Sequence, residues 1–367
     1  MTARPLRITF LCKRFFTNKD LFDERYGRYF HLPVELAKQG CSVTVWALDN
    51  RRGIQEVLEH EGARLESIPI TISSGPRCLK ELAQRASEEA DLIIAGGHLF
   101  LGLIGKWVAD RAQVPWVFDA TDYYPAHLPA WAFGKVGLFR WLLKEADGVV
   151  AMSDPLSEWI GPAQPRRITL TTGVEDRFRH APSREAACEQ LGWSVGPKRI
   201  GYFGSIMDRT GVDDLLAAHR MVVEKIPEAE LVLAGKVSLK TPLDGPGVNY
   251  VGFLTMDEVV VAMAACDVLV IPYWDHPHNR YAGPCKIAEY LAVGRPVVVT
   301  NVGNYATFFE GAPQSLCEPA SPESMGQALV RQLAEPTVQP FPEALTWSSM
   351  AAELHAFCGA IHEGRAN

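Results

Sequence analysis

The sequence predicts an α/β protein made of two Rossmann-like domains, each a parallel sheet covered by helices. Short apolar, β-rich runs alternate with segments of helical period, which is typical of parallel strands joined by helical crossovers. This pattern restarts at "KRIGYFGS", residues 198–205. The length of 367 residues also exceeds one ordinary domain. It fits two domains of about 150 to 200 residues.

The elements follow in order along both halves. In the first half strands are predicted at 6–12, 42–48, 63–70, 91–96, 115–120, 148–153 and 167–173, with helices in "YFHLPVELAKQG" and "LFLGLIGKWVADRAQ". In the second half strands are predicted at 198–205 and in "AELVLAG", "GVNYVGF", "DVLVIPY" and "RPVVVT", with helices in "VDDLLAAHRMVVEK", "MDEVVVAMAAC" and 284–293.

The domain boundaries follow from this repetition. We expect an N-terminal domain over 1–175 and a C-terminal domain over 176–342, joined by the charged, strand-poor stretch 174–197. Residues 343–367 have a helical pattern and would pack either on the second domain or back toward the first.

Composition excludes several classes. The net charge of −7 argues against a general nucleic-acid binder, although a local basic patch remains open. The N-terminus lacks a signal-peptide pattern, and no window approaches the roughly 20 apolar residues of a membrane span. We therefore expect a cytoplasmic protein. The 8 cysteines form no C-x-x-C pair, so we expect reduced, mostly buried thiols without zinc or disulfides.

The stretch "GPCKIAEYLAVGRPVVVT" holds the most informative charge. Gly283 is expected as the N-cap of a short helix and Pro284 as its first residue. Lys286 then lies in the first turn, which is unfavourable for a cation unless an anion faces it. Lys286 and the free N–H groups would hold a diphosphate, and Glu289 on the same face would accept hydrogen bonds from ribose hydroxyls. The alternative is an exposed Lys–Glu pair of little energetic weight.

The segment "NRYAGPCKIAEYLAVGRPVV" resembles the donor-binding segment of GT-B-fold glycosyltransferases of the family-4-like group, with some likeness to the inverting glucuronosyltransferases of exopolysaccharide synthesis. Further segments agree in order: "ELAKQGCSVTVWAL", "TTGVEDRF", "NYVGF", resembling the base-contacting turn, and "ACDVLVIPY". The resemblance runs from about residue 6 to about residue 350. It implies a GT-B fold, two Rossmann-like domains facing across a cleft, with the acceptor bound by the first domain and the nucleotide-sugar by the second.

The resemblance also implies donor-binding residues. Gly27 matches the glycine that opens the first helix near the donor phosphates. Gly204 would let the backbone approach the ligand, or would serve only a tight turn. Ser205 replaces the arginine that many members carry, whereas Arg209 lies near their lysine position and would contact a phosphate or stay solvated. Tyr273 begins a loop that would shape the donor-sugar pocket together with Trp274, His276, His278, Asn279 and Arg280.

The catalytic assignment rests on "PWVFDATDYYPAHL". Asp122 matches the catalytic aspartate of inverting GT-B members and is expected as the general base. Asp119 would cap a helix or pair with a basic residue, and in the alternative both carboxylates only organise the loop. His98 stands where many retaining relatives place a histidine near the sugar, or else it caps a helix or fills the core. Tyr281 replaces the glutamate of many retaining members, so retention and inversion both stay open.

Two basic segments suggest anionic partners. The loop after the first strand carries five cations that would meet diphosphates or a polyprenyl-diphosphate acceptor, or form a solvated face: Lys13, Arg14, Lys19, Arg25 and Arg28. Residues 128–146 mix Trp131, Phe133, Phe139 and Trp141 with Lys135, Arg140 and Lys144, as membrane-surface segments do. A helix packed on its domain with the basic residues outward fits the same string.

These observations predict a metal-independent glycosyltransferase, hexosyl- or glucuronosyl-transferring, without a resident cofactor. The co-substrate would be a nucleotide diphosphate-sugar, with UDP as the carrier implied by the resemblance. The acceptor would be a saccharide or polyprenyl-diphosphate-linked saccharide in surface polysaccharide synthesis, reached in the cytoplasm or at the inner face of the membrane. Alternatives are a nucleotide-sugar epimerase of the same fold and a non-catalytic two-domain sugar-binding protein.

Overall fold

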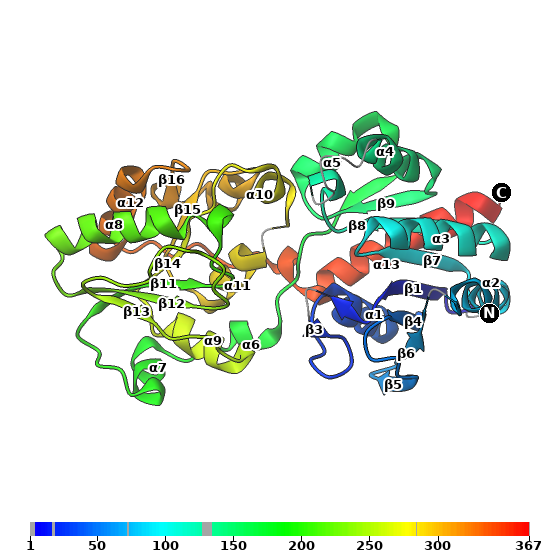
Figure 1. Ribbon diagram of the computed structural model, residues 1–367, viewed down its shortest axis with the longest axis horizontal. Coiled ribbons are helices and arrows are strands. Elements are labelled where there is room, and N and C mark those ends of the chain that lie inside the picture. The colour runs from blue at the N-terminus through cyan, green and yellow to red at the C-terminus, as the bar shows by residue number, and fades with distance from the viewer. Residues whose placement is uncertain (1–3, 17–18, 72, 127–133, 284, 367) are drawn as a thin grey trace. The chain divides into compact units, whose positions relative to one another are not determined.

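The computed structural model describes residues 4–16, 19–71, 73–126, 134–283 and 285–366. The chain divides into two compact units (Figure 1). The N-terminal unit comprises Met1–Gly173, Tyr281–Gly283 and Glu343–Asn367, and the C-terminal unit comprises Val174–Arg280 and Pro284–Pro342. The C-terminal stretch 343–367 thus belongs to the N-terminal unit.

The N-terminal unit is built on an eight-stranded sheet in the order β10-β9-β8-β7-β1-β4-β6-β5. Neighbouring strands are parallel except for β5 and β6. The strands are β1 (Arg7–Lys13), β4 (Ser42–Asp49), β5 (Glu56–His60), β6 (Ala63–Pro69), β7 (Leu92–Gly96), β8 (Trp116–Ala120), β9 (Gly148–Ala151) and β10 (Arg167–Thr169). A separate hairpin, β2 (Phe15–Phe16) with β3 (Lys19–Asp20), follows β1.

Helices cover both faces of this sheet. They are α1 (Arg28–Lys38), α2 (Gly75–Glu89), α3 (Leu99–Ala112), α4 (Lys135–Glu145), α5 (Asp154–Ile160) and α13 (Trp347–Ala366), with 3₁₀ turns at Tyr124–Ala126, Gly161–Ala163 and Glu343–Leu345. α13 packs on α1, whereas α3 contacts α2 and α4. Right-handed crossovers that leave β1 toward β4 and β7 toward β8 run in opposite directions along the sheet. They therefore place α1 and α3 on opposite faces.

The C-terminal unit has a fully parallel six-stranded sheet in the order β13-β12-β11-β14-β15-β16. The strands are β11 (Lys198–Phe203), β12 (Ala229–Ala234), β13 (Val248–Tyr250), β14 (Val268–Ile271), β15 (Val297–Thr300) and β16 (Leu316–Cys317). The helices are α6 (Asp176–Arg179), α7 (Arg184–Leu191), α8 (Val212–Lys225), α9 (Met256–Ala264), α10 (Pro277–Tyr281), α11 (Cys285–Val293) and α12 (Pro322–Ala334). Further 3₁₀ turns lie at Asp208–Thr210, Tyr305–Phe309 and Pro313–Ser315.

The stretch 174–197, which was expected to join the two domains without strands, forms regular helical structure. It contains α6 and α7, and α7 packs on α9 within the C-terminal unit. The side chain of Ser183 caps α7 by accepting the N–H of Ala186, and Gly192 ends the helix with a positive φ.

Helix α4 corrects one expectation about the basic, aromatic segment 128–146. Phe139 was expected with the aromatics of a membrane-contacting surface, but its ring is fully buried in the core of the N-terminal unit. Trp141 is exposed, whereas Trp131 and Phe133 lie outside the described residues. Among the described residues, no helix is both long enough and apolar enough to cross a membrane.

Most of the cysteines are buried, as expected. All 8 are free, and six are buried: Cys12, Cys41, Cys188, Cys266, Cys317 and Cys358. Burial raises the pKa of the Cys12 and Cys266 thiols, which keeps them protonated and unreactive.

Candidate functional site

The carboxyl edge of the C-terminal sheet brings Gly204 and Lys286 together. Gly204 directly follows β11 and has a φ of +151°. A Cβ at this position would collide with Nζ and Cε of Lys286, so the lysine side chain lies directly against the glycine backbone. Carboxyl edges of parallel sheets are where such folds bind ligands. Two residues that are 82 positions apart in the sequence therefore lie at one surface.

Glycines extend this surface across the neighbouring strands. Gly235 follows β12, and a Cβ there would collide with the carbonyl oxygen of Gly204. The N–H of Gly235 donates to the carbonyl oxygen of Gly252 at 2.8 Å, in the turn after β13. Phe253 follows with 78% of its surface exposed. Glycine backbone thus extends from Lys286 toward the exposed ring of Phe253. Such a surface suits a ligand with a charged end and a planar end.

Helix α11 presents Lys286 and Glu289 on one side. Both side chains are half-buried, whereas Ile287, Ala288 and Leu291 of the same helix are buried. The hydroxyl of Tyr290 accepts a hydrogen bond from the backbone N–H of Phe203 at 3.0 Å, which ties the helix to the end of β11. The helix begins at Cys285, and Pro284, the expected first residue, lies outside the described residues.

Tyr273 lies beside the same helix. Burial is the largest cause that raises the pKa of Tyr273, and the neighbouring Cys285 and Glu289 raise it further. Arg209 is close enough to lower the pKa of the Tyr273 phenol. The phenol therefore stays protonated and can act as a hydrogen-bond donor next to Glu289 and Arg209.

Backbone contacts fix the loops that carry Arg209 and Tyr273. The carbonyl oxygen of Arg209 accepts hydrogen bonds from Asn279 Nδ2 at 2.9 Å and from the N–H of Trp274 at 3.4 Å. Trp274 Nε1 donates to Asp214 at 2.6 Å. Asn279, expected in the donor-sugar pocket, is buried and instead holds these two loops together.

In the N-terminal unit, His98 and Asp122 follow neighbouring strands. His98 caps α3 after β7, and its Nδ1 accepts the N–H of Phe100 at 3.3 Å. Asp122 follows β8 and is half-buried, and its Oδ1 accepts the N–H of Tyr123 at 2.7 Å. The ring centroids of His98 and Tyr124 are 6.4 Å apart. Both catalytic candidates thus lie at the carboxyl edge of this sheet.

Asp119 has a different environment from Asp122. Its Oδ1 lies 3.0 Å from the guanidinium of Arg28, and both side chains are buried. Burial raises the pKa of Asp119, while the charge of Arg28 and the hydroxyl of Tyr29 act to lower it. Arg28 also donates to the carbonyl oxygen of Leu170 at 3.1 Å. Asp119 is therefore a structural partner of a basic residue, which is one of the roles considered from the sequence.

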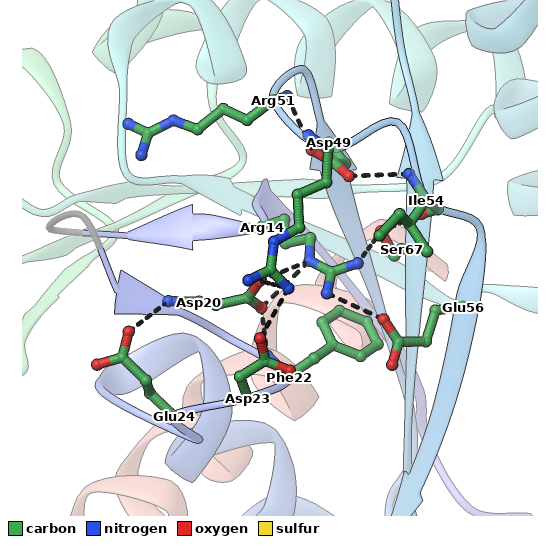
Figure 2. Close-up of polar contacts among 11 residues, drawn as sticks. Arg14, Asp20, Phe22, Asp23, Glu24, Asp49, Arg51, Ile54, Glu56 and Ser67 are labelled. Carbon is green, nitrogen blue, oxygen red and sulfur yellow. Dashed lines mark hydrogen bonds and ion pairs between the residues drawn. The ribbon is translucent and has the colours of Figure 1, made fainter.

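Arg14 is enclosed in a similar way (Figure 2). Its Nε lies 3.0 Å from Asp20 and its terminal nitrogens lie 2.9 Å from Glu56 and 3.0 Å from Ser67. The expectation that Arg14 and Arg28 meet diphosphates is wrong, because both are buried in ion pairs within the protein. The sequence did not reveal these ion pairs, because Glu56 is distant from Arg14 along the chain and Asp119 is distant from Arg28.

The remaining loop cations are more accessible. Lys13 and Lys19 are half-buried and Arg25 is exposed. The ammonium of Lys19 lies 3.8 Å from the ring centroid of Tyr26. Gly27 is the N-cap of α1 and has a φ of +79°, a backbone conformation that favours glycine; a Cβ there would lie 3.4 Å from the ring of Phe16.

Tyr281 replaces the family's glutamate, and its ring lies within the N-terminal unit. The centroids of the Tyr281 and Tyr123 rings are 4.9 Å apart, and Ser153 Oγ donates to the carbonyl oxygen of Tyr281 at 2.8 Å. Across the described parts of the chain, no group of three or more His, Cys, Asp or Glu side chains could hold a metal ion.

Comparison with known families gives two matches. The family "Glycosyl transferase 4-like domain" matches residues 28–171, and "Glycosyl transferases group 1" matches residues 197–335. These ranges cover both sheets and include the segments that carry the candidate residues of each unit.

Curated relatives are distant glycosyltransferases. TuaC of Bacillus subtilis, named as a glycosyltransferase of teichuronic acid biosynthesis, is 24% identical over 262 residues, 69% of this chain and 64% of TuaC. The sulfoquinovosyl transferase of Arabidopsis thaliana is 24% identical over 65% of this chain and 47% of its own length. The alpha-monoglucosyldiacylglycerol synthase of Streptococcus pneumoniae is 24% identical over 59% of this chain and 52% of its own length. The chain thus spans about half to two thirds of these relatives.

Solved structures share the fold along nearly the whole chain. Sucrose-phosphate synthase from Thermosynechococcus elongatus superimposes with a TM-score of 0.68 at 18% identity, covering 98% of this chain and 97% of that one. HepE of Anabaena in complex with UDP gives the same TM-score and identity over 98% of both chains. The two family matches, which together cover most of the chain, show that it belongs to the glycosyltransferases of the family-4-like group, and the solved structures show that its fold is GT-B.

Proposed function

We propose that this glycosyltransferase moves a hexosyl or glucuronosyl group from a UDP-sugar to a hydroxyl of a saccharide or lipid-linked saccharide in surface polysaccharide synthesis. The contact of Lys286 with the backbone of Gly204 carries the proposal, because it places one positive charge where the glycine has no side chain to block the approach of a diphosphate. Similar proteins support the details. TuaC is named for teichuronic acid biosynthesis, and HepE was solved with UDP and with UDP-glucose.

The donor would lie along the carboxyl edge of the C-terminal sheet. Lys286 and the first-turn N–H groups of α11, from Cys285 onward, would hold the diphosphate, and Glu289 would accept hydrogen bonds from the ribose hydroxyls. The base would extend over Gly235 and Gly252 toward Phe253. Arg209 and Tyr273 would contact the phosphates or the sugar. In this arrangement the lysine and the helix N-terminus supply the positive charge, so we propose that no divalent ion is required.

The transfer itself needs one proton acceptor. The acceptor oxygen bonds to the anomeric carbon, the bond from that carbon to the diphosphate breaks, and UDP leaves with the electron pair. In an inverting reaction, Asp122 would take the proton of the acceptor hydroxyl, and His98 would contact the sugar. In a retaining reaction, the leaving diphosphate would take that proton and Asp122 would orient the acceptor. The anomeric configuration of the product, determined by NMR, distinguishes the inverting reaction from the retaining one.

A panel of nucleotide-sugars tests the proposal. We expect UDP-sugars to raise the melting temperature of the protein more than GDP- or ADP-sugars do, because ligands that bind the folded state stabilise it by mass action. The preferred donor is then incubated with oligosaccharide acceptors in the presence of EDTA, and transfer is followed by mass spectrometry. Stabilisation by no UDP-sugar would overturn the donor assignment, and transfer that stops in EDTA would overturn metal independence.

A further inference from the structure

Lys13 is a half-buried cation at the carboxyl end of a central strand. It is the last residue of β1, which lies between β7 and β4 in the N-terminal sheet. Among the residues that the structure describes, its ammonium has no hydrogen-bond or ion-pair partner. A half-buried ammonium loses part of its hydration, so an anion from outside the chain would stabilise it.

Arg51 brings a second positive charge to Lys13. It lies in the turn after β4, the strand that pairs with β1. Burial lowers the pKa of Lys13 and the charge of Arg51 lowers it further, so the two cations are close enough to repel each other. The Arg51 guanidinium lies 4.8 Å from the ring centroid of Phe15, and the side chain extends away from the Arg14 ion pairs (Figure 2). We call these two cations the Lys13–Arg51 site.

The carboxylates near this site have other partners. Asp20 and Glu56 pair with Arg14. The oxygens of Asp49 accept backbone N–H groups in the turn after β4. None of these contacts includes the ammonium of Lys13. A ligand that carries a negative charge would therefore supply what the neighbouring carboxylates do not.

The Lys13–Arg51 site lies on the same sheet edge as the catalytic candidates. The register of β1 with β7, continued by two residues, sets Lys13 opposite Gly97, the residue before His98. The strand order is β8-β7-β1-β4. Neighbouring strands are about 4.8 Å apart, so the site lies about 10 to 14 Å from the end of β8, which precedes Asp122. This distance exceeds the width of one sugar ring.

We propose that the Lys13–Arg51 site binds an anionic group of the acceptor, a carboxylate or a phosphate, while a hydroxyl of the same acceptor reacts beside Asp122. Because of the distance, the anion would belong to a neighbouring sugar residue or to the diphosphate of a lipid carrier. A guanidinium next to an ammonium suits both groups. The assignment to the acceptor rests on the proposed function, in which the N-terminal unit binds the acceptor.

Two anionic probes, each with an uncharged match, test the proposal on the full chain with UDP at saturation. Isothermal titration compares oligogalacturonate with its methyl ester, and citronellyl diphosphate with citronellol. At least one anionic probe should bind on the order of ten-fold more tightly than its uncharged match. Preference for oligogalacturonate identifies a sugar carboxylate, and preference for citronellyl diphosphate identifies a carrier diphosphate.

Lys13→Met and Arg51→Gln should each weaken binding of that probe on the order of ten-fold, because each removes a charged hydrogen bond. Arg51 is exposed, so its substitution leaves the fold intact. The matched control is Lys80→Met, which removes an exposed lysine of α2 in the same unit and should bind the probe normally. UDP affinity should be unchanged in all three variants.

Equal affinity for the anionic and uncharged probes, or unchanged probe affinity in either site variant, would overturn the proposal. So would weaker UDP binding in Lys13→Met, since the site would then serve the donor. Oligogalacturonate titrated without UDP measures the anion site by itself. Failure of the protein to bind any UDP-sugar would therefore be seen separately from failure of this proposal.

Discussion

At the residue scale, the two carboxylates at the carboxyl end of β8 have separate environments: Asp119 lies within the strand and Asp122 follows it. Asp119 is buried against Arg28, whereas Asp122 is half-buried, and its Oδ1 accepts the backbone N–H of Tyr123. A general base needs access to the acceptor hydroxyl, and a carboxylate enclosed in an ion pair lacks that access. We therefore propose Asp122, three residues after Asp119, as the residue that takes the proton.

We predict that Asp122→Asn lowers turnover by about 10² to 10⁴ in an inverting reaction, since the amide keeps the shape but cannot accept the proton. UDP affinity should stay near that of the unmodified protein. Steady-state kinetics with the identified acceptor, together with calorimetry of UDP binding, provide both numbers. Near-full transferase activity in Asp122→Asn would contradict the assignment and direct attention to His98.

At the element scale, the first turn of α1 ties the N-terminal sheet together. Arg28 reaches Asp119 of β8 and the carbonyl oxygen of Leu170 after β10. A Cβ at Gly96, the last residue of β7, would lie 2.6 Å from the hydroxyl of Tyr29. One helix turn thus sets the ends of three strands, including those that precede His98 and Asp122.

We predict that Arg28→Met lowers the free energy of unfolding by about 3 to 5 kcal/mol, because Asp119 would remain as an unpaired buried charge. Adding Asp119→Leu should recover most of that loss, since no charge is then buried. Urea denaturation of the single and double variants measures both effects. If Arg28→Met alone unfolds like the unmodified protein, the ion pair does not hold these strands.

A second element-scale prediction concerns α8, where His219 is buried against β12. Its Nε2 lies 3.3 Å from the carbonyl oxygen of Ala229, and burial lowers its pKa below the ordinary value of 6.5. As pH falls below about 6.5, the unfolded state binds a proton on this histidine before the folded state does. The free energy of unfolding therefore decreases from about pH 6.5 down to the lower pKa of the folded state. Urea denaturation at pH 7.5 and 5.5 should show a smaller acid loss for His219→Gln than for the unmodified protein. An equal loss would show that other groups cause it.

The sequence predicted the elements better than the partners of their charged residues. The main parallel strands and the Gly294 end of α11 follow from local apolar runs and turn residues, which act over a few positions. Edge strand β5 was missed because its five residues "EVLEH" include two glutamates and form no apolar run. Arg14 and Arg28 were misjudged because burial and ion pairing depend on residues that only the fold brings near.

At the scale of the whole molecule, charge and chemistry are unevenly distributed. The chain carries a net charge of −7, yet the C-terminal unit places a cation, Lys286, against Gly204 at the carboxyl edge of its sheet, with Gly235 next to Gly204. Each unit thus has its own carboxyl edge with its own chemistry. The donor assignment belongs to the C-terminal unit alone and can be tested by binding, without knowledge of the acceptor.

Isothermal titration of UDP into Lys286→Ala tests the central claim most directly. The variant should lose about 10- to 150-fold in affinity, the scale of a charged hydrogen bond, with little change in unfolding free energy. Gly204→Ala should also bind UDP less tightly, because its Cβ would displace Lys286. Lys225→Ala, which removes an exposed lysine at the other end of the C-terminal sheet, is the control and should bind normally. If Lys286→Ala binds UDP as tightly as the unmodified protein, Lys286 does not hold the diphosphate, and the proposed donor site is wrong.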